Sequence, residues 1–112
     1  MAIAQDSGFR YEVEESKDST GWKTTTIHCH GRLVNQTAEK IKGLVKPLIP
    51  EGGRIVLDFA DLDYLDSSGL GALVGLKVSA IRQGMVKLEL TNLSPRLKDL
   101  LSMTNLIQLL GS

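Results

Sequence analysis

The fold of this chain is decided by the stretch RIVLDFADLDYLDSSGLGAL, residues 54–73. Residues 55–59 are apolar except for Asp58, which is the pattern of a strand covered on both faces. An acidic segment follows and is predicted to be a turn, and from Gly69 the apolar residues recur at helical spacing. The stretch therefore predicts a buried strand that leads through a turn into a helix.

Two adjacent hydroxyl groups, those of Ser67 and Ser68, lie where this helix is predicted to begin. Serine is a favoured N-cap residue because its side-chain oxygen accepts a hydrogen bond from a free amide of the first helical turn. The same free amides and the positive end of the helix dipole also stabilise a phosphate group. The junction is therefore either a plain helix cap or a phosphorylation switch.

A phosphate on Ser67 would add about two negative charges beside Asp66. Helix amides can hold this group with little change of fold. A partner whose acidic or apolar surface meets the helix start would instead be repelled, and its surface would be costly to desolvate. The predicted mechanism is a binding switch that is operated by local electrostatics.

The other segments predict an opening hairpin and then alternating helices and strands. The predicted strands are residues 9–15, 22–31, 55–59, 85–90 and 106–110, and the predicted helices are residues 37–48, 69–82 and a segment from Ser94-Pro95 onward. Asn35 or Thr37 is expected to cap the first helix. Helical crossovers require parallel neighbouring strands, whereas the hairpin is antiparallel. We predict one α/β domain at residues 9–112, with a small mixed sheet and helices packed against it, after a flexible N-terminus at residues 1–8.

The helix predicted at residues 69–82 carries two groups of apolar or small residues. Its core stripe is predicted to contain Leu70, Leu73, Val74, Val78 and Ile81. Gly71 and Gly75 share another side, and each costs about 1 kcal/mol relative to alanine inside a helix. Either close packing within the domain or close approach by another protein would offset that cost. In the second case Leu76 would be an exposed apolar contact.

The composition gives no sign of a nucleic-acid or membrane protein. The 112 residues include 13 Lys+Arg and 13 Asp+Glu, so the formal net charge is zero. This balance gives no reason to expect direct binding of nucleic acid. The apolar runs are too short to span a membrane and the first ten residues do not form a signal peptide, so we expect a cytoplasmic protein without membrane insertion. Cys29, the only cysteine, is interpreted as a small core residue.

Catalysis is not indicated by the side chains available. A nucleophilic serine requires a base, and the only histidines are His28 and His30, which share one face of a predicted strand. We interpret them as surface or half-buried strand residues, because no third metal ligand at a usual spacing accompanies them. The sequence contains no phosphate-binding loop and no dinucleotide fingerprint. We therefore predict no catalytic residue, no metal and no cofactor.

The whole pattern resembles the STAS domain family, and within it the free-standing bacterial anti-sigma-factor antagonists. The resemblance rests on IVLDF at residues 55–59, on LDYLDSSGLG at residues 62–71 and on GRL at residues 31–33, and it extends over roughly residues 10–110. The family implies a single α/β domain of the kind predicted above.

The resemblance also implies a role in a partner-switching pathway that regulates transcription. An antagonist of this family binds an anti-sigma factor that is also a serine kinase. The kinase phosphorylates the first serine of the motif and thereby releases the antagonist, and a serine phosphatase resets it. By position, Ser67 is the expected phosphorylation site. The expected partner-binding residues lie in the first turns of the helix and are Asp66, Ser67, Ser68, Gly69, Gly71, Ala72 and Leu76.

One departure from the family pattern supports an alternative function. Many antagonists carry an aspartate where this chain has Val34. In the alternative, the chain is a STAS scaffold or accessory domain of a signalling complex or a membrane transporter, and it does not cycle through a phosphorylated form.

Overall fold

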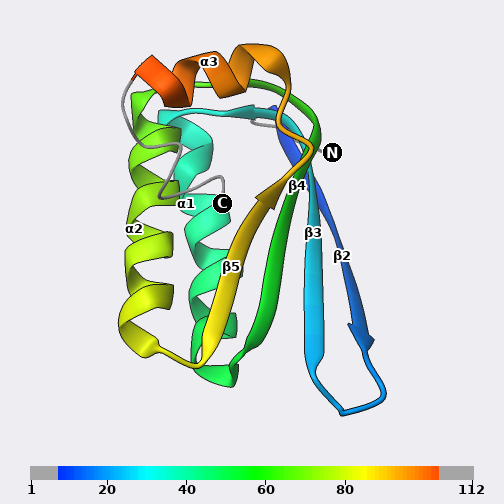
Figure 1. The fold of residues 1–112 in the computed structure, drawn as a ribbon. Coiled ribbons are helices and arrows are strands. Elements are labelled where there is room, and N and C mark those ends of the chain that lie inside the picture. Colours follow the sequence, from blue (N-terminus) through cyan, green and yellow to red (C-terminus); the bar gives the residue numbers. More distant parts are fainter. Residues whose placement is uncertain (1–7, 104–112) are drawn as a thin grey trace.

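A computed structural model of the chain describes residues 8–103 and shows one mixed sheet with helices packed against it (Figure 1). The strands are β2 (Phe9–Lys17), β3 (Lys23–Leu33), β4 (Gly53–Leu65) and β5 (Val86–Thr91). The helices are α1 (Asn35–Val45), the short 3-10 helix η1 (Lys46–Glu51), α2 (Ser67–Gln83) and α3 (Pro95–Met103). The predicted α/β domain is confirmed. The strand predicted at 106–110 and nearly all of the N-terminus predicted to be flexible lie outside the described residues.

The sheet has the strand order β2-β3-β4-β5. β2 and β3 form the predicted antiparallel hairpin, whereas β3 pairs with β4, and β4 with β5, in parallel. Helices α1 and α2 lie side by side against one face of the sheet (Figure 1). The parallel strands therefore end at the same edge of the sheet, and α1 and α2 both begin there.

The core lies between the sheet and the two long helices. Alternate residues of the central strands are buried there, among them Ile27, Cys29, Ile55, Leu57 and Phe59. β2 differs, because only Phe9 is buried and its other residues are exposed. The edge strand β2 is therefore attached to the domain mainly through its pairing with β3.

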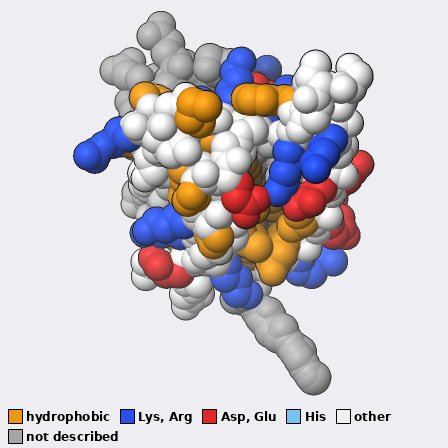
Figure 2. All heavy atoms as spheres, turned by 90° about the horizontal axis from the view of Figure 1, so that it is seen from below, with side chains coloured by type: hydrophobic (Ala, Val, Ile, Leu, Met, Phe, Trp, Pro, Cys, Tyr) orange, Lys and Arg blue, Asp and Glu red, His pale blue; other side chains and the backbone are white. Residues whose placement is uncertain are grey.

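The connections at the lower end of the molecule expose two large apolar side chains. Trp22 lies between β2 and β3, and Met85 lies between α2 and β5. Both line a shallow hollow together with Gly52 and Gly53, which adopt positive φ angles. Viewed from below, hydrophobic side chains appear among charged ones (Figure 2). Within the described residues, no helix is long and apolar enough to cross a membrane.

β4 is longer than predicted. The acidic segment that was expected to form a turn continues as strand to Leu65, which pairs with Leu33 of β3. The register of this pairing shifts where β4 passes from Asp58 to Asp61. This shift and a second one between Leu62 and Tyr64 break the period of two, so that the buried positions of β4 fall at residues 55–57, 59, 62 and 65.

The buried side of α2 also differs from the predicted stripe. Val78 and Ile81 are 40% and 58% exposed, and of the predicted stripe only Leu73 is fully buried. The buried residues of α2 are Gly69, Ala72, Leu73, Leu76 and Ala80. Small residues predominate on this side because α1 packs against α2 as well as the sheet does. Nearly every residue of α2 is apolar or small, so hydrophobic periodicity alone could not identify the buried side.

The helix starts agree only partly with the prediction. Val34, and not Asn35 or Thr37, is the N-cap of α1. The Thr37 hydroxyl instead accepts a hydrogen bond from the Val34 amide at 2.8 Å. At α3 the prediction is confirmed, because the Leu97 amide donates to Ser94 Oγ at 3.2 Å and Pro95 is the first helical residue.

Candidate functional site

The candidate site lies where β4 leads into α2. Asp66 is the N-cap of α2, and its Oδ1 accepts a hydrogen bond from the Gly69 amide at 2.9 Å. Ser67 and Ser68 are consequently the first two residues of the helix and not its caps, which corrects the cap interpretation. A carboxylate at this position also interacts favourably with the positive end of the helix dipole. The sequence left open whether the serines cap the helix or carry a phosphate. Because Asp66 supplies the cap, the serine side chains are not needed for capping.

Ser67 is exposed at the surface. Within residues 8–103, its hydroxyl makes no hydrogen bond to another side chain or to the backbone. The hydroxyl is therefore accessible to a modifying enzyme, and its modification would break no hydrogen bond to the described part of the chain. Phosphorylation at this position stays a prediction.

Ser68 connects the starts of the two long helices. Its side chain is half-buried, and its hydroxyl donates to Oδ1 of Asn35 over 3.5 Å. Asn35 was not predicted as a site residue, although an asparagine just ahead of a predicted helix is a recognisable signal for a residue at a helix start. The contact places the first turn of α1 beside the first turn of α2.

Gly69 packs closely against the end of β3, and its role in partner binding stays a prediction. It is buried, and a Cβ atom at this position would meet the carbonyl oxygen of Leu33 and lie 2.8 Å from Cδ1 of Leu65. The Asp66 amide also donates to the Leu33 carbonyl oxygen at 3.2 Å. The backbone at the start of α2 thus packs directly against the end of β3.

The helix residues beyond the first turn behave differently from the prediction. Ala72 and Leu76 are 2% and 1% exposed, so the prediction that Leu76 forms an exposed contact is wrong. Both side chains belong to the hydrophobic core of the domain. Gly71 and Gly75 are exposed, and in the described part of the chain an added Cβ would meet no atom within 4 Å. Close packing within the described residues therefore does not account for these two glycines.

A shallow hollow of about 210 Å³ runs beside the two exposed glycines. Its walls come from α1 and α2, and its lining comprises Lys42, Lys46, Gly71, Ala72, Gly75, Leu76 and Ser79. Lys42 forms an ion pair with Glu39 at 3.1 Å. The buried Ala72 and Leu76 thus belong to the floor of a surface hollow that begins one turn beyond Ser67.

The N-cap role of Asp66 can be tested by substitution. Asp66→Ala is expected to lower the free energy of unfolding by about 1 kcal/mol, because the Gly69 amide loses its acceptor. Asp66→Asn retains a side-chain oxygen and is expected to lose much less. Urea denaturation of the three proteins measures the difference. An equal loss in both variants would show that the negative charge, and not the cap hydrogen bond, stabilises the helix start.

The histidines and the cysteine occupy the positions that the sequence predicted. His28 and His30 are half-buried on one face of β3, which confirms their interpretation as strand residues. Cys29 is 1% exposed, and burial raises the pKa of its thiol to about 12, so it is a small core residue. Within residues 8–103, no group of three or more His, Cys, Asp or Glu side chains is arranged to hold a metal ion.

Comparisons with known proteins agree with this architecture. The sequence profile of the STAS domain matches residues 12–110. The anti-sigma-B factor antagonist of Bacillus subtilis (strain 168) is 32% identical over 80 residues, which cover 71% of this chain and 72% of the relative. The anti-sigma-B factor antagonist of Listeria monocytogenes is 35% identical over 81 residues, covering 71% and 70%.

The fold is also similar to solved structures of the anti-sigma factor antagonist SpoIIAA. Its unphosphorylated form gives a TM-score of 0.69 at 22% identity and covers 90% of this chain and 85% of that chain. The phosphorylated form of SpoIIAA from Bacillus gives a TM-score of 0.65 at 22% identity, with coverage of 90% and 88%.

Proposed function

We propose that this chain, which belongs to the STAS domain family, is an anti-sigma-factor antagonist whose binding is switched off by phosphorylation of Ser67. Its partner is an anti-sigma factor with serine kinase activity, and a serine phosphatase restores the binding form in the cytoplasm. The names of the two curated relatives support the antagonist role. The observation that carries the regulated part is the exposed hydroxyl of Ser67 at the first position of α2, which has no hydrogen-bond partner among residues 8–103.

The local charges explain how one phosphate could control binding. The Gly69 amide is already bound to the Asp66 carboxylate, so a phosphate on Ser67 would share the helix end with an existing negative charge. Together the two groups would carry about three negative charges on one helical turn. A partner that approaches this turn would have to desolvate them without enough free amides to balance them. The kinase would bind the ATP and catalyse the phosphorylation. The chain itself would therefore act as a binding protein and not as an enzyme.

The exposed glycines indicate how the binding surface continues. Gly71 and Gly75 follow Ser67 along α2 and leave the helix backbone open to close approach. In a solvent-exposed helix such residues lower stability by about 1 kcal/mol each relative to alanine, so selection for folding alone does not favour them. We propose that the partner lies over Ser67 and Gly71. In this arrangement Ala72 and Leu76 support the surface from below.

Val34 favours a second candidate function. It occupies the N-cap of α1, directly before Asn35, which contacts Ser68. An apolar side chain therefore lies near the candidate site at the position where the family resemblance led us to expect an aspartate. In the second candidate function the chain is a scaffold or accessory domain of a signalling complex or a membrane transporter, and Ser67 is never phosphorylated.

Phosphate mapping distinguishes the two functions. The purified chain would be incubated with ATP and each serine-kinase anti-sigma factor of its own cell, and then analysed by mass spectrometry. The proposal expects one phosphate, on Ser67, and none in the variant Ser67→Ala, which retains Ser68. A kinase that binds the chain but leaves Ser67 unmodified would contradict the proposed switch. Copurification with a transporter or a large assembly would support the second candidate.

A further inference from the structure

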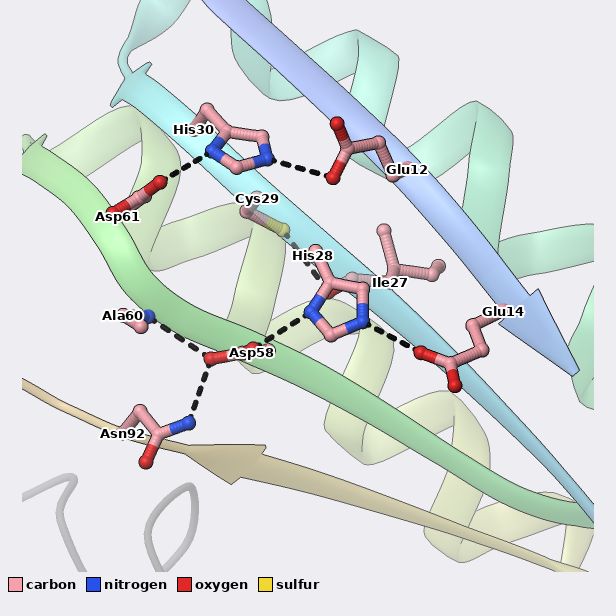
Figure 3. Close-up of polar contacts among 10 residues, drawn as sticks. All are labelled: Glu12, Glu14, Ile27, His28, Cys29, His30, Asp58, Ala60, Asp61 and Asn92. Atoms are coloured by element: carbon pink, nitrogen blue, oxygen red, sulfur yellow. Dashed lines mark hydrogen bonds and ion pairs between the residues drawn. The ribbon is translucent and has the colours of Figure 1, made fainter. Parts of the chain in front are cut away.

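Two histidine rings connect three strands on the sheet face opposite α1 and α2 (Figure 3). The ring of His28 on β3 contacts Glu14 of β2 through Nε2 at 3.0 Å and Asp58 of β4 through Nδ1 at 2.7 Å. Both ring nitrogens of this histidine are therefore occupied by carboxylate oxygens.

The second ring repeats the arrangement one step along the sheet. His30 contacts Glu12 of β2 through Nε2 at 3.2 Å and Asp61 of β4 through Nδ1 at 2.8 Å. Glu12 lies directly opposite His28 in the hairpin, and Arg10 lies opposite His30. Each ring instead contacts the glutamate two residues further along β2, so the two contacts are diagonal and repeat with the same offset. The repeat also depends on the register shift in β4, which brings Asp61 beside His30.

The number of hydrogen bonds that an imidazole ring can donate depends on its protonation. An ionised carboxylate only accepts hydrogen bonds, and a neutral imidazole carries one N–H and therefore donates only one. A ring that lies between two carboxylates can make both hydrogen bonds only as an imidazolium. The two hydrogen bonds of His28 therefore hold together only while its ring is protonated.

Asp58 is held in its ionised form by other groups. Its Oδ1 accepts hydrogen bonds from the Ala60 amide at 3.0 Å and from Nδ2 of Asn92 at 2.8 Å. Burial raises the pKa of Asp58, but the hydrogen bonds from Asn92, Ala60 and His28 outweigh it and keep this pKa below its usual value. The hydrogen bonds to Glu14 and Asp58 in turn raise the pKa of His28, against the smaller effect of its desolvation.

The strand that these rings fasten is the least buried strand of the sheet. β2 lies at the edge, and only Phe9 among its residues is buried. Beyond its backbone pairing with β3, β2 is joined across the sheet to β4 by the chains Glu14–His28–Asp58 and Glu12–His30–Asp61.

We propose that His28 and His30 form a clamp that holds β2 on the sheet, and that this clamp loosens when the ring of His28 loses its proton. The charged groups that face the rings come from both neighbouring strands, and they are Arg10, Glu12, Glu14, Asp58 and Asp61. Four of these five are acidic, and two of them, Glu14 and Asp58, favour the protonated ring of His28. The clamp lies on a different face from Ser67 and does not depend on the proposed switch.

The direction of the pH effect follows from the pKa of His28. This pKa is higher in the folded chain than in the unfolded chain, where it lies near 6.5. The stabilisation is therefore fully present below about pH 6.5 and is lost as the pH rises through the folded pKa of His28. We expect β2 to open more often in mildly alkaline solution than at pH 6.

Amide hydrogen exchange of the full chain measures this opening. Protection factors of the β2 amides, corrected for intrinsic exchange, are expected to fall several-fold between pH 6 and pH 8.5 relative to those of β4, because opening of β2 then no longer breaks the charge-assisted hydrogen bonds of the His28 ring. The double variant His28→Gln, His30→Gln is expected to lack this pH dependence. Wild-type protection that does not change with pH, or a double variant that keeps the change, would overturn the clamp.

Single glutamate variants test the same inference if the double variant does not fold. Glu14→Gln is expected to lower the pKa of His28 in an NMR titration and to weaken the pH dependence of β2 protection. Glu15→Gln is the matched control, since it removes a negative charge from the same strand but its partner is Lys23, at 3.6 Å. An unchanged His28 titration in Glu14→Gln, or an equal shift in Glu15→Gln, would also overturn the clamp.

Discussion

Ser67→Glu is expected to weaken binding of the chain to its anti-sigma factor by about 100-fold, which corresponds to about 2.7 kcal/mol. The variant places a permanent negative charge next to Asp66, at the turn where the proposed partner docks. The same charge is favourable in the free chain, because acidic side chains at the start of a helix interact with its dipole. We therefore expect binding and stability to change in opposite directions, which excludes misfolding as the cause.

Isothermal titration calorimetry with the purified anti-sigma factor measures the binding, and urea denaturation measures the stability. Ser67→Ala should bind like the wild type, because it adds no charge. Ser102→Glu is a matched control, since Ser102 is an exposed serine on α3. Wild-type affinity in Ser67→Glu would refute the docking of a partner at this turn. An equal loss in Ser102→Glu would instead indicate a general effect of charge.

Gly69→Ala is expected to lower the free energy of unfolding by about 3 kcal/mol, or to prevent folding altogether. Its Cβ would meet the Leu33 carbonyl oxygen and lie 2.8 Å from Cδ1 of Leu65, and the backbone of Leu33 leaves little room for adjustment. The loss should appear in urea or thermal denaturation.

Gly71→Ala, two residues further along the same helix, is the matched control. Apart from the adjacent helix backbone, no atom of residues 8–103 lies within 4 Å of its added Cβ, so we expect it to stabilise the chain by about 1 kcal/mol through helix propensity alone. Equal destabilisation by both substitutions would show that the close packing of Gly69 against β3 has no measurable effect on stability. Weaker partner binding by Gly71→Ala, in spite of its higher stability, would support close approach at this glycine.

The sequence predicted the fold class and the order of the elements well, because these depend on strong local patterns. Residues 55–59 are apolar enough to identify a buried strand, and Ser94-Pro95 marks a helix start directly. The continuation of β4 to Leu65 was missed because the register shift near Asp58 breaks the period of two. An irregular step of this kind depends on the pairing with β3, which one strand's own sequence does not contain.

The candidate site was predicted at the correct place but with incomplete roles. The acidic and hydroxyl residues at the strand-to-helix junction identified the position of Ser67, yet Asp66 and not a serine is the cap. The exposure of Leu76 was predicted wrongly because α2 is apolar on most sides, so only its packing against α1 determines which side is buried. The contacts of His28 depend on the hairpin register and on β4, and neither is encoded near the histidine itself.

The close packing of the start of α2 against the Leu33 carbonyl affects how fast a partner can bind. The Asp66 amide donates to this oxygen and Gly69 packs against it. The start of α2 therefore cannot move away from a group that is added to Ser67. Modification at Ser67 would then alter the electrostatic potential of the surface and leave its shape nearly the same. A partner that meets such a preorganised surface need not wait for a rearrangement, so its capture would be limited by diffusion and orientation, with little ordering entropy lost by this chain.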